Sequence, residues 1–443
     1  MEPTSQQHAT IVVGTGPGGA AVARDLAAAG ERVLMLEWGA NEAVTGGLAQ
    51  TLAELGTPGK SVMITSGMLA AVRAITTGGS SVYFYGTAFD PPFTMWDRYG
   101  IDLRAEVAAI KAELPIAPLP ADLIGPKATR IMDAAHAAGL DWAPLPKFVD
   151  QDEARKGGWL GYYMAPSYET KWNARKWVDA ALAHGAELVT GAHVGRVVVD
   201  GGVATGVEYT KDGETRLAHA DRVVVAAGGI GSPVILARSG IEGVGRDFFY
   251  DPLVCVMGEA PGVSSGPEMP MVAGVHCSDD GYMMTDMTVP RSLYSLMSAQ
   301  VGRVDRLGAY PRTLQIMVKA KDGLSGHLSA GGGVRKGLTR DDRAKLAHGY
   351  ERAKKVLEAA NARHVYKSWY MASHPGGTVK IDEFVDRDLK TRYDNLYVCD
   401  CSVIPEAWGL PPTLTLLALG RRLAAHLSGT HRTTTSPEPV ARG

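Results

Sequence analysis

The sequence predicts an α/β fold. The first strands of its parallel sheet come early in the chain, and a further strand of the same sheet follows only much later. Residues 10–37 read as a buried strand, a glycine-rich loop, an alanine-rich helix and a second buried strand. Residues 100–190 are mostly helical in pattern. A further all-apolar strand, Arg222–Ala227, follows only after them and ends at a pair of glycines. These three observations predict one parallel sheet with a long excursion between its strands.

Size and composition bound the kind of protein. A chain of 443 residues allows about two to four domains. The formal net charge is -2, so there is no overall basic field to hold a nucleic acid or an anionic membrane. Glycine, with 53 residues, departs most from the usual composition of globular proteins. The 45% hydrophobic content excludes a disordered chain. The glycine excess therefore serves a folded structure.

The cysteines and the N-terminal segment indicate a reduced compartment. Four cysteines at irregular spacing suit neither a disulfide framework nor a zinc ribbon, so we predict no metal site. The first ten residues lack the basic and apolar regions of a signal peptide, and no run of 18 apolar residues occurs. We expect a cytoplasmic protein without a membrane span.

The first strand, Thr10–Gly14, leads into the loop Gly14–Gly19, which fits G-x-G-x-x-G, and then into a helix predicted over Ala20–Ala29. The glycines permit a tight turn, the approach of a diphosphate and close helix packing, while the helix N-terminus attracts phosphate. The second strand, Arg32–Glu37, ends on a carboxylate that can accept hydrogen bonds from an adenosine ribose. Together they predict a dinucleotide site.

The middle of the chain alternates between helical and β-type patterns. Helices are predicted over Ala105–Leu114 and Lys127–Ala138, and again around Pro233–Ser239. A meander of separate short strands is predicted over Glu187–Val189, Val194–Asp200, Ala204–Tyr209 and Thr215–His219.

Residues 245–365 are less regular and carry eight methionines between Met257 and Met317, among them Met269, Met271, Met283, Met284 and Met287. These side chains either line a cavity for a bulky apolar substrate or fill an irregular core. Arginines in the same block, Arg291, Arg303 and Arg306, could meet a substrate carboxylate or simply face solvent.

Proteins that bind NAD and proteins that bind FAD both contain this glycine loop. A later strand of the same sheet far downstream, here Arg222–Ala227, is typical of flavoproteins in which FAD extends across several segments. Four further runs resemble the glucose-methanol-choline (GMC) oxidoreductases. The most specific is Asn395–Pro405, N-L-Y-V-C-D-C-S-V-I-P, followed by Leu410–Thr415 and a helix over Leu416–Leu427. The others, in family order, are Gly78–Ser81, Val223–Gly240 and Ser373–Thr378.

This resemblance implies an FAD-binding Rossmann-like domain interleaved with a substrate domain of antiparallel sheet plus helices. We assign residues 1–100, 185–245 and 385–430 to the FAD-binding domain and residues 101–184 and 246–384 to the substrate-binding domain. The Thr-, Ser- and Pro-rich residues 431–443 are predicted to be a disordered tail.

The resemblance also implies which residues hold FAD. The diphosphate is expected at the backbone of Gly14, Gly16, Gly19 and Asp400. Glu37 is expected at the ribose, and the main chain of Val194 at the adenine. The loop of Gly79 and Ser80 should lie beside the flavin ring, with Pro411 and Pro412 near its pyrimidine edge. No histidine lies in that loop, so we expect non-covalent FAD.

His374, in the motif resembling H-x-x-G-T, is our candidate catalytic base, because imidazole accepts a proton at neutral pH. The family usually places a second polar residue, Asn or His, where this chain has Pro411. Proline has neither a side-chain hydrogen-bonding group nor an amide N–H. The role of the missing Asn or His must be taken by another group, such as Tyr370, Trp408 or a water, or be dispensable.

We therefore predict an FAD-dependent alcohol dehydrogenase or oxidase that transfers hydride from a CH–OH group of a small to bulky alcohol or sugar-like substrate to flavin N5. Two alternatives stay open: a GMC-fold flavoenzyme with lyase, photodecarboxylase or double-bond reductase chemistry, motivated by Pro411, and a flavin-binding protein without turnover. The expected partners are a small-molecule substrate and an electron acceptor that is oxygen, a quinone or a redox protein, with no nucleic acid.

Overall fold

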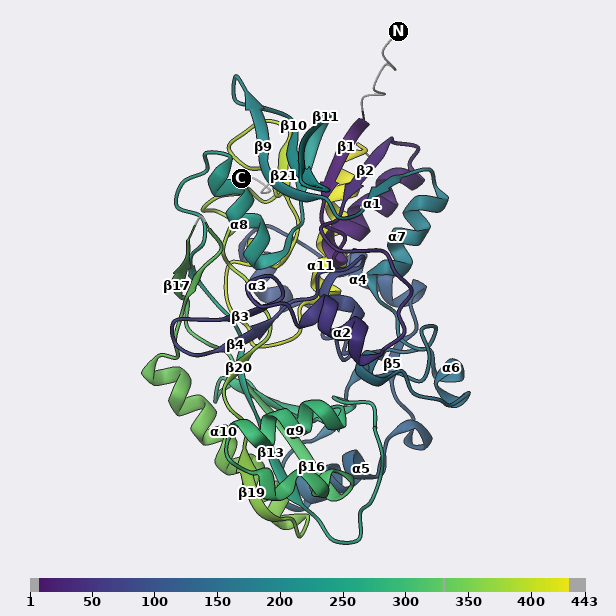
Figure 1. Cartoon of the computed structure of the whole chain (residues 1–443), viewed down its shortest axis with the longest axis vertical. Coiled ribbons are helices and arrows are strands. Elements are labelled where there is room, and N and C mark those ends of the chain that lie inside the picture. The colour runs from purple at the N-terminus through teal and green to yellow at the C-terminus, as the bar shows by residue number, and fades with distance from the viewer. Residues whose placement is uncertain (1–7, 330, 430–443) are drawn as a thin grey trace, which may run out of the picture.

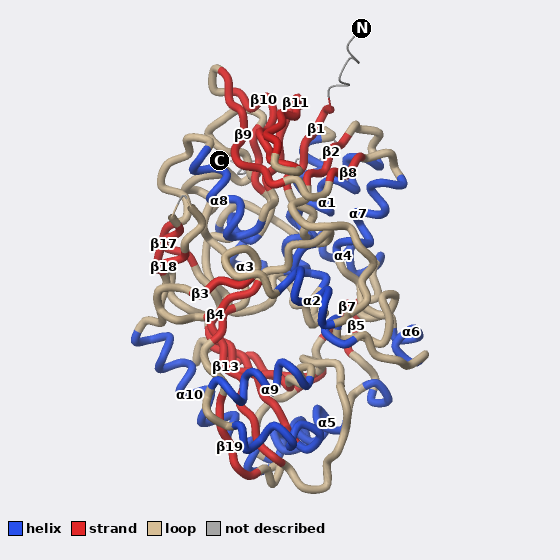
Figure 2. Tube along the Cα trace, viewed as in Figure 1, coloured by secondary structure: helices blue, strands red, loops and turns tan. Residues whose placement is uncertain are grey.

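The computed structural model describes residues 8–329 and 331–429. Its strands gather in two main groups along the long axis of the molecule, with helices and long loops around them (Figure 1, Figure 2). Within the described residues no helix is both long and apolar enough to cross a bilayer. The tail predicted over residues 431–443 lies outside the described part of the chain.

The first sheet has seven strands in the order β8-β2-β1-β11-β10-β9, with β21 paired to β11. β8, β2, β1, β11 and β21 run parallel, whereas β9, β10 and the first half of β11 form an antiparallel meander. This confirms the predicted Rossmann-like sheet. The strand bounds are β1 (His8–Val13), β2 (Val33–Leu36), β8 (Glu187–Val189), β9 (His193–Asp200), β10 (Val203–Lys211), β11 (Glu214–Val225) and β21 (Leu396–Val398).

Two strand predictions in this region are wrong. The runs Thr215–His219 and Arg222–Ala227 are one strand, β11, because its exposed first half pairs with β10 while its buried end continues into the parallel sheet. The run Glu187–Val189 does not join the meander. It pairs with β2 at the edge of the parallel sheet, where its register is Met35 opposite Leu188.

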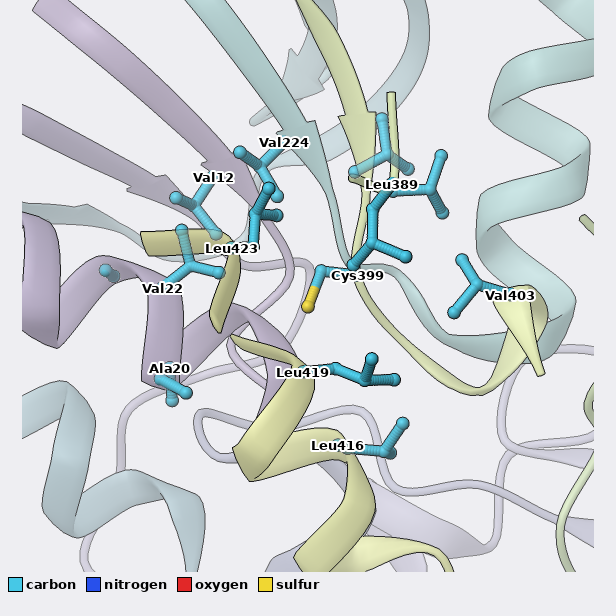
Figure 3. Close-up of a cluster of buried hydrophobic side chains, with 14 of the residues drawn as sticks. Val12, Ala20, Val22, Val224, Leu389, Cys399, Val403, Leu416, Leu419 and Leu423 are labelled. Carbon is cyan, nitrogen blue, oxygen red and sulfur yellow. The ribbon is translucent and has the colours of Figure 1, made fainter. Parts of the chain in front are cut away.

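Helices cover this sheet and bury its apolar residues. α1 (Pro17–Ala28) begins inside the glycine loop, three residues before the predicted start, since proline fits the first helical turn. α11 (Thr413–Leu427) packs closely against α1: a Cβ added at Gly420 would overlap the side chain of Ala21. Figure 3 shows the core between them, where Val12, Val22, Cys399, Leu419 and Leu423 meet. Three more helices are part of this region, α4 (Arg104–Glu113), α7 (Ala174–Ala183) and α8 (Gly228–Arg238).

The second sheet has nine strands in the order β3-β4-β20-β13-β16-β15-β14-β6, with β19 paired to β13. All its pairs are antiparallel except β20 with β4. The bounds are β3 (Val62–Ile64), β4 (Ala70–Val72), β6 (Ala143–Pro144), β13 (Pro252–Glu259), β14 (Ala273–Cys277), β15 (Tyr282–Asp286), β16 (Thr313–Ala320), β19 (Arg363–Lys367) and β20 (Met371–Ala372).

The two faces of this sheet pack against different parts of the molecule. One face lies under α5 (Pro126–Ala137) and α10 (Arg340–Ala359). The other, which we call the inner face, packs against α9 (Arg291–Gln300) and against Tyr85, Phe89 and Leu410 from segments that belong with the first sheet. The inner face is therefore turned toward the dinucleotide-binding region.

The remaining elements include two small sheets, β12-β17-β18 and β5-β7, and some segments cross the predicted domain boundaries. β3 and β4 lie within residues 1–100 yet extend the second sheet, while α7 lies within residues 101–184 yet packs on α1. The domain boundaries given above stay a prediction. The other elements are α2 (Leu48–Leu55), α3 (Phe93–Arg98), α6 (Gln151–Arg155), β5 (Ile116–Pro118), β7 (Pro146–Phe148), β12 (Arg246–Phe248), β17 (Ser325–Leu328) and β18 (Val334–Arg335).

Candidate active site

The glycine loop between β1 and α1 is closely packed except at its second glycine. A Cβ added at Gly14 would overlap the carbonyl oxygen of Ala226, and one added at Gly19 would overlap the carbonyl oxygen of Gly14. Gly14 also has φ +96°, a conformation that favours glycine. At Gly16 an added Cβ would meet no atom within 4 Å. The loop therefore has one open approach, at Gly16, directly before the first turn of α1.

Glu37 follows β2 with its carboxylate turned back to this loop. Thr15 donates to Oε2 from its amide at 3.1 Å and from its hydroxyl at 2.6 Å, and the Gly39 amide donates to Oε1 at 2.7 Å. Burial raises the pKa of Glu37. Since two carboxylate oxygens offer about four acceptor sites, Glu37 retains the capacity to accept from ribose hydroxyls.

The glycine-serine loop lies beside the open approach. The Gly78 amide donates to the Thr15 hydroxyl at 3.0 Å, and a Cβ added at Gly79 would lie 3.1 Å from the Cα of Gly16. Ser80 accepts at its hydroxyl from the Ala74 amide at 3.1 Å. The structure thus brings the predicted Gly79 and Ser80 next to the predicted Gly16.

Asp400 joins the end of β21 to the start of α8. Its carboxylate accepts from the Gly228 amide at 2.8 Å, the Ser232 hydroxyl at 2.5 Å and the Ser402 amide at 2.8 Å, and burial raises its pKa. A Cβ added at Gly228 would meet nothing within 4 Å, which makes a second open point. The side chain is thus used within the protein, and the contact of the Asp400 backbone with a diphosphate stays a prediction.

Val194 lies on β9, paired with Tyr209. Just before this strand, the Ala192 amide donates to the Glu37 carbonyl at 2.8 Å. Val194 therefore follows, two residues later, a segment that contacts the end of β2. Its contact with adenine stays a prediction.

The loop that carries His374 is fixed between the two sheets. Phe249 and Gly376 exchange backbone hydrogen bonds, the Gly377 amide donates to the Cys401 carbonyl at 3.1 Å, and the Thr378 hydroxyl donates to the Gly229 carbonyl at 2.8 Å. The loop therefore contacts the N-terminus of α8 and the segment after Asp400, both of which belong to the dinucleotide-binding region.

Two buried charged side chains face one edge of the imidazole. His374 Nδ1 lies 3.0 Å from Asp251 Oδ2, and since a carboxylate only accepts, Nδ1 is the donor in this contact. Lys319 Nζ donates to the same oxygen at 3.3 Å and lies 3.3 Å from Nδ1. The Ser373 hydroxyl is 3.2 Å from Nδ1. The side chains of Asp251 and Lys319 are 1% exposed, whereas that of His374 is 27% exposed. Because the Nδ1 edge is covered, the exposed edge is the one that carries Nε2.

Two family models match this chain, both described as GMC oxidoreductase. The N-terminal model covers residues 53–253 and the C-terminal model covers residues 333–420. The chain belongs to the GMC oxidoreductase family. GMC oxidoreductases bind FAD, and FAD is therefore the cofactor of this protein.

Relatives and solved structures match over most of the chain. An uncharacterized protein of Methanocaldococcus jannaschii is 26% identical over 79% of this chain and 86% of its own length. The long-chain-alcohol oxidase FAO3 of Arabidopsis thaliana is 21% identical over 92% of this chain, which spans 66% of the plant enzyme. Pyridoxine 4-oxidase from Mesorbium loti superposes with a TM-score of 0.75 at 17% identity, covering 96% of this chain and all of the other, which shows the shared fold.

The described residues fit FAD at the points the family predicts. The open approach at Gly16 lies at the N-terminus of α1, where the helix dipole favours a diphosphate. At Gly228, the N-terminus of α8, there is open space as well, but the amide already donates to Asp400. The Glu37 carboxylate lies beside this loop, and its contact with the ribose stays a prediction. FAD, when bound, supplies the hydride-accepting chemistry of a flavin.

The surroundings of His374 favour a neutral ring. Burial and the positive charge of Lys319 lower its pKa, and Asp251 opposes this shift. Burial likewise lowers the pKa of Lys319, again opposed by Asp251. The neutral imidazole with Nδ1–H bonded to Asp251 carries its lone pair on Nε2.

A second ion pair holds Asp251 in place. Asp251 has φ +48°, and its amide donates to Asp322 Oδ1 at 3.0 Å. Lys336 Nζ lies 2.9 Å from Asp322 Oδ2 and donates to the Phe248 carbonyl at 2.8 Å. Burial raises the pKa of Asp322 to about 6. The turn that aims Asp251 at His374 is therefore built on a buried Asp–Lys pair.

The prolines of the C-terminal motif, Pro411 and Pro412, lie at the start of α11, and their place near the flavin edge stays a prediction. Pro412 is the N-cap residue of α11, and its neighbour Leu410 packs against the cores of both regions. The candidate replacements make other contacts: Trp408 packs on Trp96 and Phe249, and Tyr370 packs on Trp369. Within the described residues, neither of them is hydrogen-bonded to His374.

Sequence reasoning missed Asp251 and Lys319. One signal was available: Lys319 is the single charged residue in the strand Thr313–Ala320, every residue of which is buried. A lysine that interrupts a buried strand needs a partner. The identity of that partner, which is far away in the sequence, could not be read from the pattern.

Proposed function

We propose that this protein oxidises a CH–OH group of an alcohol, with His374 as the catalytic base. The observation that carries the proposal is the imidazole held at Nδ1 by buried Asp251 while its Nε2 edge stays exposed. Family membership supports an oxidoreductase, and the Arabidopsis relative is named as an alcohol oxidase.

In this mechanism His374 Nε2 takes the hydroxyl proton of the substrate as the carbon–hydrogen bond is broken. The proton converts the ring to imidazolium, which the Asp251 carboxylate stabilises through Nδ1–H. Lys319 disfavours the imidazolium, so the proton is released again after turnover. FAD, when bound, would supply the hydride acceptor, and an electron acceptor would complete the cycle.

The test is anaerobic reduction of the bound flavin by a panel of primary and secondary alcohols. Replacing His374 by Ala is expected to leave FAD bound and to slow reduction about 10²–10⁴-fold, the usual contribution of a general base. His184→Ala, an exposed histidine at the end of α7, is the matched control and should reduce at the wild-type rate. Reduction of the His374→Ala holoenzyme at a near wild-type rate would remove the assignment.

Pro411 favours a second candidate, a GMC-fold enzyme with non-standard chemistry, because it removes the polar side chain that usually pairs with the base. The same alcohol panel separates the two. Turnover of any alcohol supports oxidation, whereas turnover of a fatty acid under illumination, with no alcohol oxidised, supports the second candidate.

A further inference from the structure

Two polar side chains on the inner face have polar atoms without partners. Gln315 on β16 and Thr285 on β15 are both fully buried. Among the described residues, none lies within hydrogen-bonding reach of Gln315 Nε2 or of the Thr285 hydroxyl. Thr285 is paired with Met317, which lies between Gln315 and Lys319 on one face of the strand. A buried polar group without a hydrogen-bond partner costs free energy, so these two groups indicate a place where a ligand binds.

The orientation of the Gln315 amide follows from its neighbour. The Cys255 thiol donates to Gln315 Oε1 at 3.9 Å. Burial raises the pKa of Cys255 to about 12, which keeps it a protonated donor. The amide oxygen therefore faces Cys255, and the two N–H groups of Nε2 face away from it.

The surroundings of these two groups are apolar and adaptable. Met257 pairs with Gln315 across the sheet, and Met283, Met287 and Met317 belong to the same buried cluster. Unbranched methionine side chains can rearrange around a ligand. The methionine block of the sequence is thus divided: Met284 packs on the opposite face of the sheet, and only part of the block faces the catalytic base.

Beside His374 the inner face carries the buried pair Lys319 and Asp251. The arginines considered for a substrate carboxylate are engaged elsewhere: Arg306 pairs with Glu259 and Asp305, and Arg303 pairs with Asp305. Arg291 is exposed. Arg303 and Arg306 therefore offer an anionic substrate no free cation, while Arg291 faces solvent.

We propose that Gln315 and Thr285 form a subsite for an uncharged oxygen in the tail of the substrate. The substrate class is then an alcohol with a mainly apolar body that carries an ether, carbonyl or hydroxyl oxygen several bonds from the oxidised carbon. This inference rests on the proposed function, because it places the reacting carbon at His374.

The strand β16 sets the distance between the two ends of this substrate. Gln315 and Lys319 are four residues apart, which is about 13 Å between their Cα atoms at the rise of a strand. Lys319 Nζ reaches to 3.3 Å from the His374 ring. An apolar segment over Met317 therefore connects an alcohol at His374 to an oxygen at Gln315.

The experiment compares pairs of alcohols with the same number of heavy atoms on the FAD-loaded enzyme. The ether series is 4-methoxybutan-1-ol, 6-methoxyhexan-1-ol and 8-methoxyoctan-1-ol, and the matched alkanols are hexan-1-ol, octan-1-ol and decan-1-ol. At one length, the ether is expected to have a kcat/KM for flavin reduction and a calorimetric Kd about 10- to 100-fold better than its alkanol. Gln315→Met should abolish that preference, and Met257→Leu should keep it.

The outcomes separate this inference from the proposed function. Equal binding of ether and alkanol at every length, or no binding of either series, overturns the subsite. So does a preference that survives in Gln315→Met. If Gln315→Met fails to fold, Thr285→Val supplies the second test and should weaken the preference in the same direction. A clear binding preference without flavin reduction would leave the subsite standing and contradict alcohol oxidation alone.

Discussion

The dinucleotide-binding region and the inner face of the second sheet are built in opposite ways. The first relies on the absence of side chains, because Gly14 and Gly19 leave room only for backbone and Gly16 leaves room for a ligand. The second relies on charged and polar side chains buried within apolar strands, such as Lys319 and Gln315. A glycine loop is local in sequence, whereas the contacts of a buried polar group join distant segments.

This difference predicts that single substitutions act differently in the two regions. In the dinucleotide-binding region, a substitution that fills the open approach should affect the ligand more than the fold. On the second sheet, removing one member of a buried ion pair should affect the fold or the base directly. Four substitutions test the comparison, in order of decreasing effect.

The largest effect is expected for Lys336→Met. Lys336 and Asp322 are each 1% exposed at the side chain, so the substitution leaves an uncompensated buried carboxylate. We expect a loss of about 3–5 kcal/mol in the free energy of unfolding by urea. Lys354→Met removes a more exposed lysine paired with Glu358 at 3.9 Å and should cost about 0–1 kcal/mol. A similarly small loss in the free energy of unfolding for both variants would contradict a structural role for the buried pair.

Asp251→Asn comes next and should act on the base. The asparagine amide can donate to Nδ1, which favours the tautomer with the proton on Nε2 and removes the lone pair from that atom. We expect flavin reduction to slow by the order of 10²-fold, with the flavin still bound. Loss of the carboxylate also lowers the pKa of His374 further, so the acid limb of the kcat/KM profile should move to lower pH.

A matched control for Asp251 exists four residues upstream. Asp247 has a similar backbone, φ +47°, and is exposed. Asp247→Asn should leave both the reduction rate and the pH profile unchanged. If the two variants behave alike, the effect comes from the turn and not from the hydrogen bond to His374.

Gly16→Ala tests the open approach. Gly16 has φ -63°, so alanine adds no backbone strain, and its methyl group would meet no protein atom within 4 Å. We expect the stability of the apoprotein to change by less than about 0.5 kcal/mol, while FAD binds about 10- to 100-fold more weakly, measured by fluorescence titration. Gly19→Ala, which would overlap the Gly14 carbonyl, should instead cost about 1–3 kcal/mol of stability. Unchanged FAD affinity in Gly16→Ala would place the diphosphate elsewhere.

Much of the dinucleotide-binding region could be predicted from the sequence because its signals are local. The strand before Gly14, the spacing of the glycines and the carboxylate at Glu37 lie within residues 10–37, and the parallel sheet follows from them. The main error there, the division of β11, arose where one strand passes from an exposed hairpin into a buried sheet. The residues of β11 change from mostly exposed to buried at that point, although the strand itself continues.

The candidate base was predicted from the sequence, but its partners were not. His374 lies in a short motif, whereas Asp251 and Lys319 come from two other segments that meet only through the antiparallel pairing of β13 and β16. That pairing places Leu253 opposite Lys319 and so puts the turn at Asp251 beside the lysine. Such a register depends on the whole sheet, and no single segment encodes it.

The smallest effect on flavin reduction, and the sharpest test of the comparison, is expected for Lys319→Met, which also leaves buried Asp251 without its lysine and should cost stability as Lys336→Met does. Removing the ammonium beside Nδ1 leaves His374 facing Asp251 alone, so the pKa of the imidazole should rise. The base acts in its neutral form. The acid limb of kcat/KM should therefore move to higher pH, opposite to the shift in Asp251→Asn. Lys321→Met removes an exposed lysine from the same segment and should leave the limb in place. Shifts in the same direction for Asp251 and Lys319 would show that the two variants merely loosen the loop, whereas opposite shifts require that both charges act on His374.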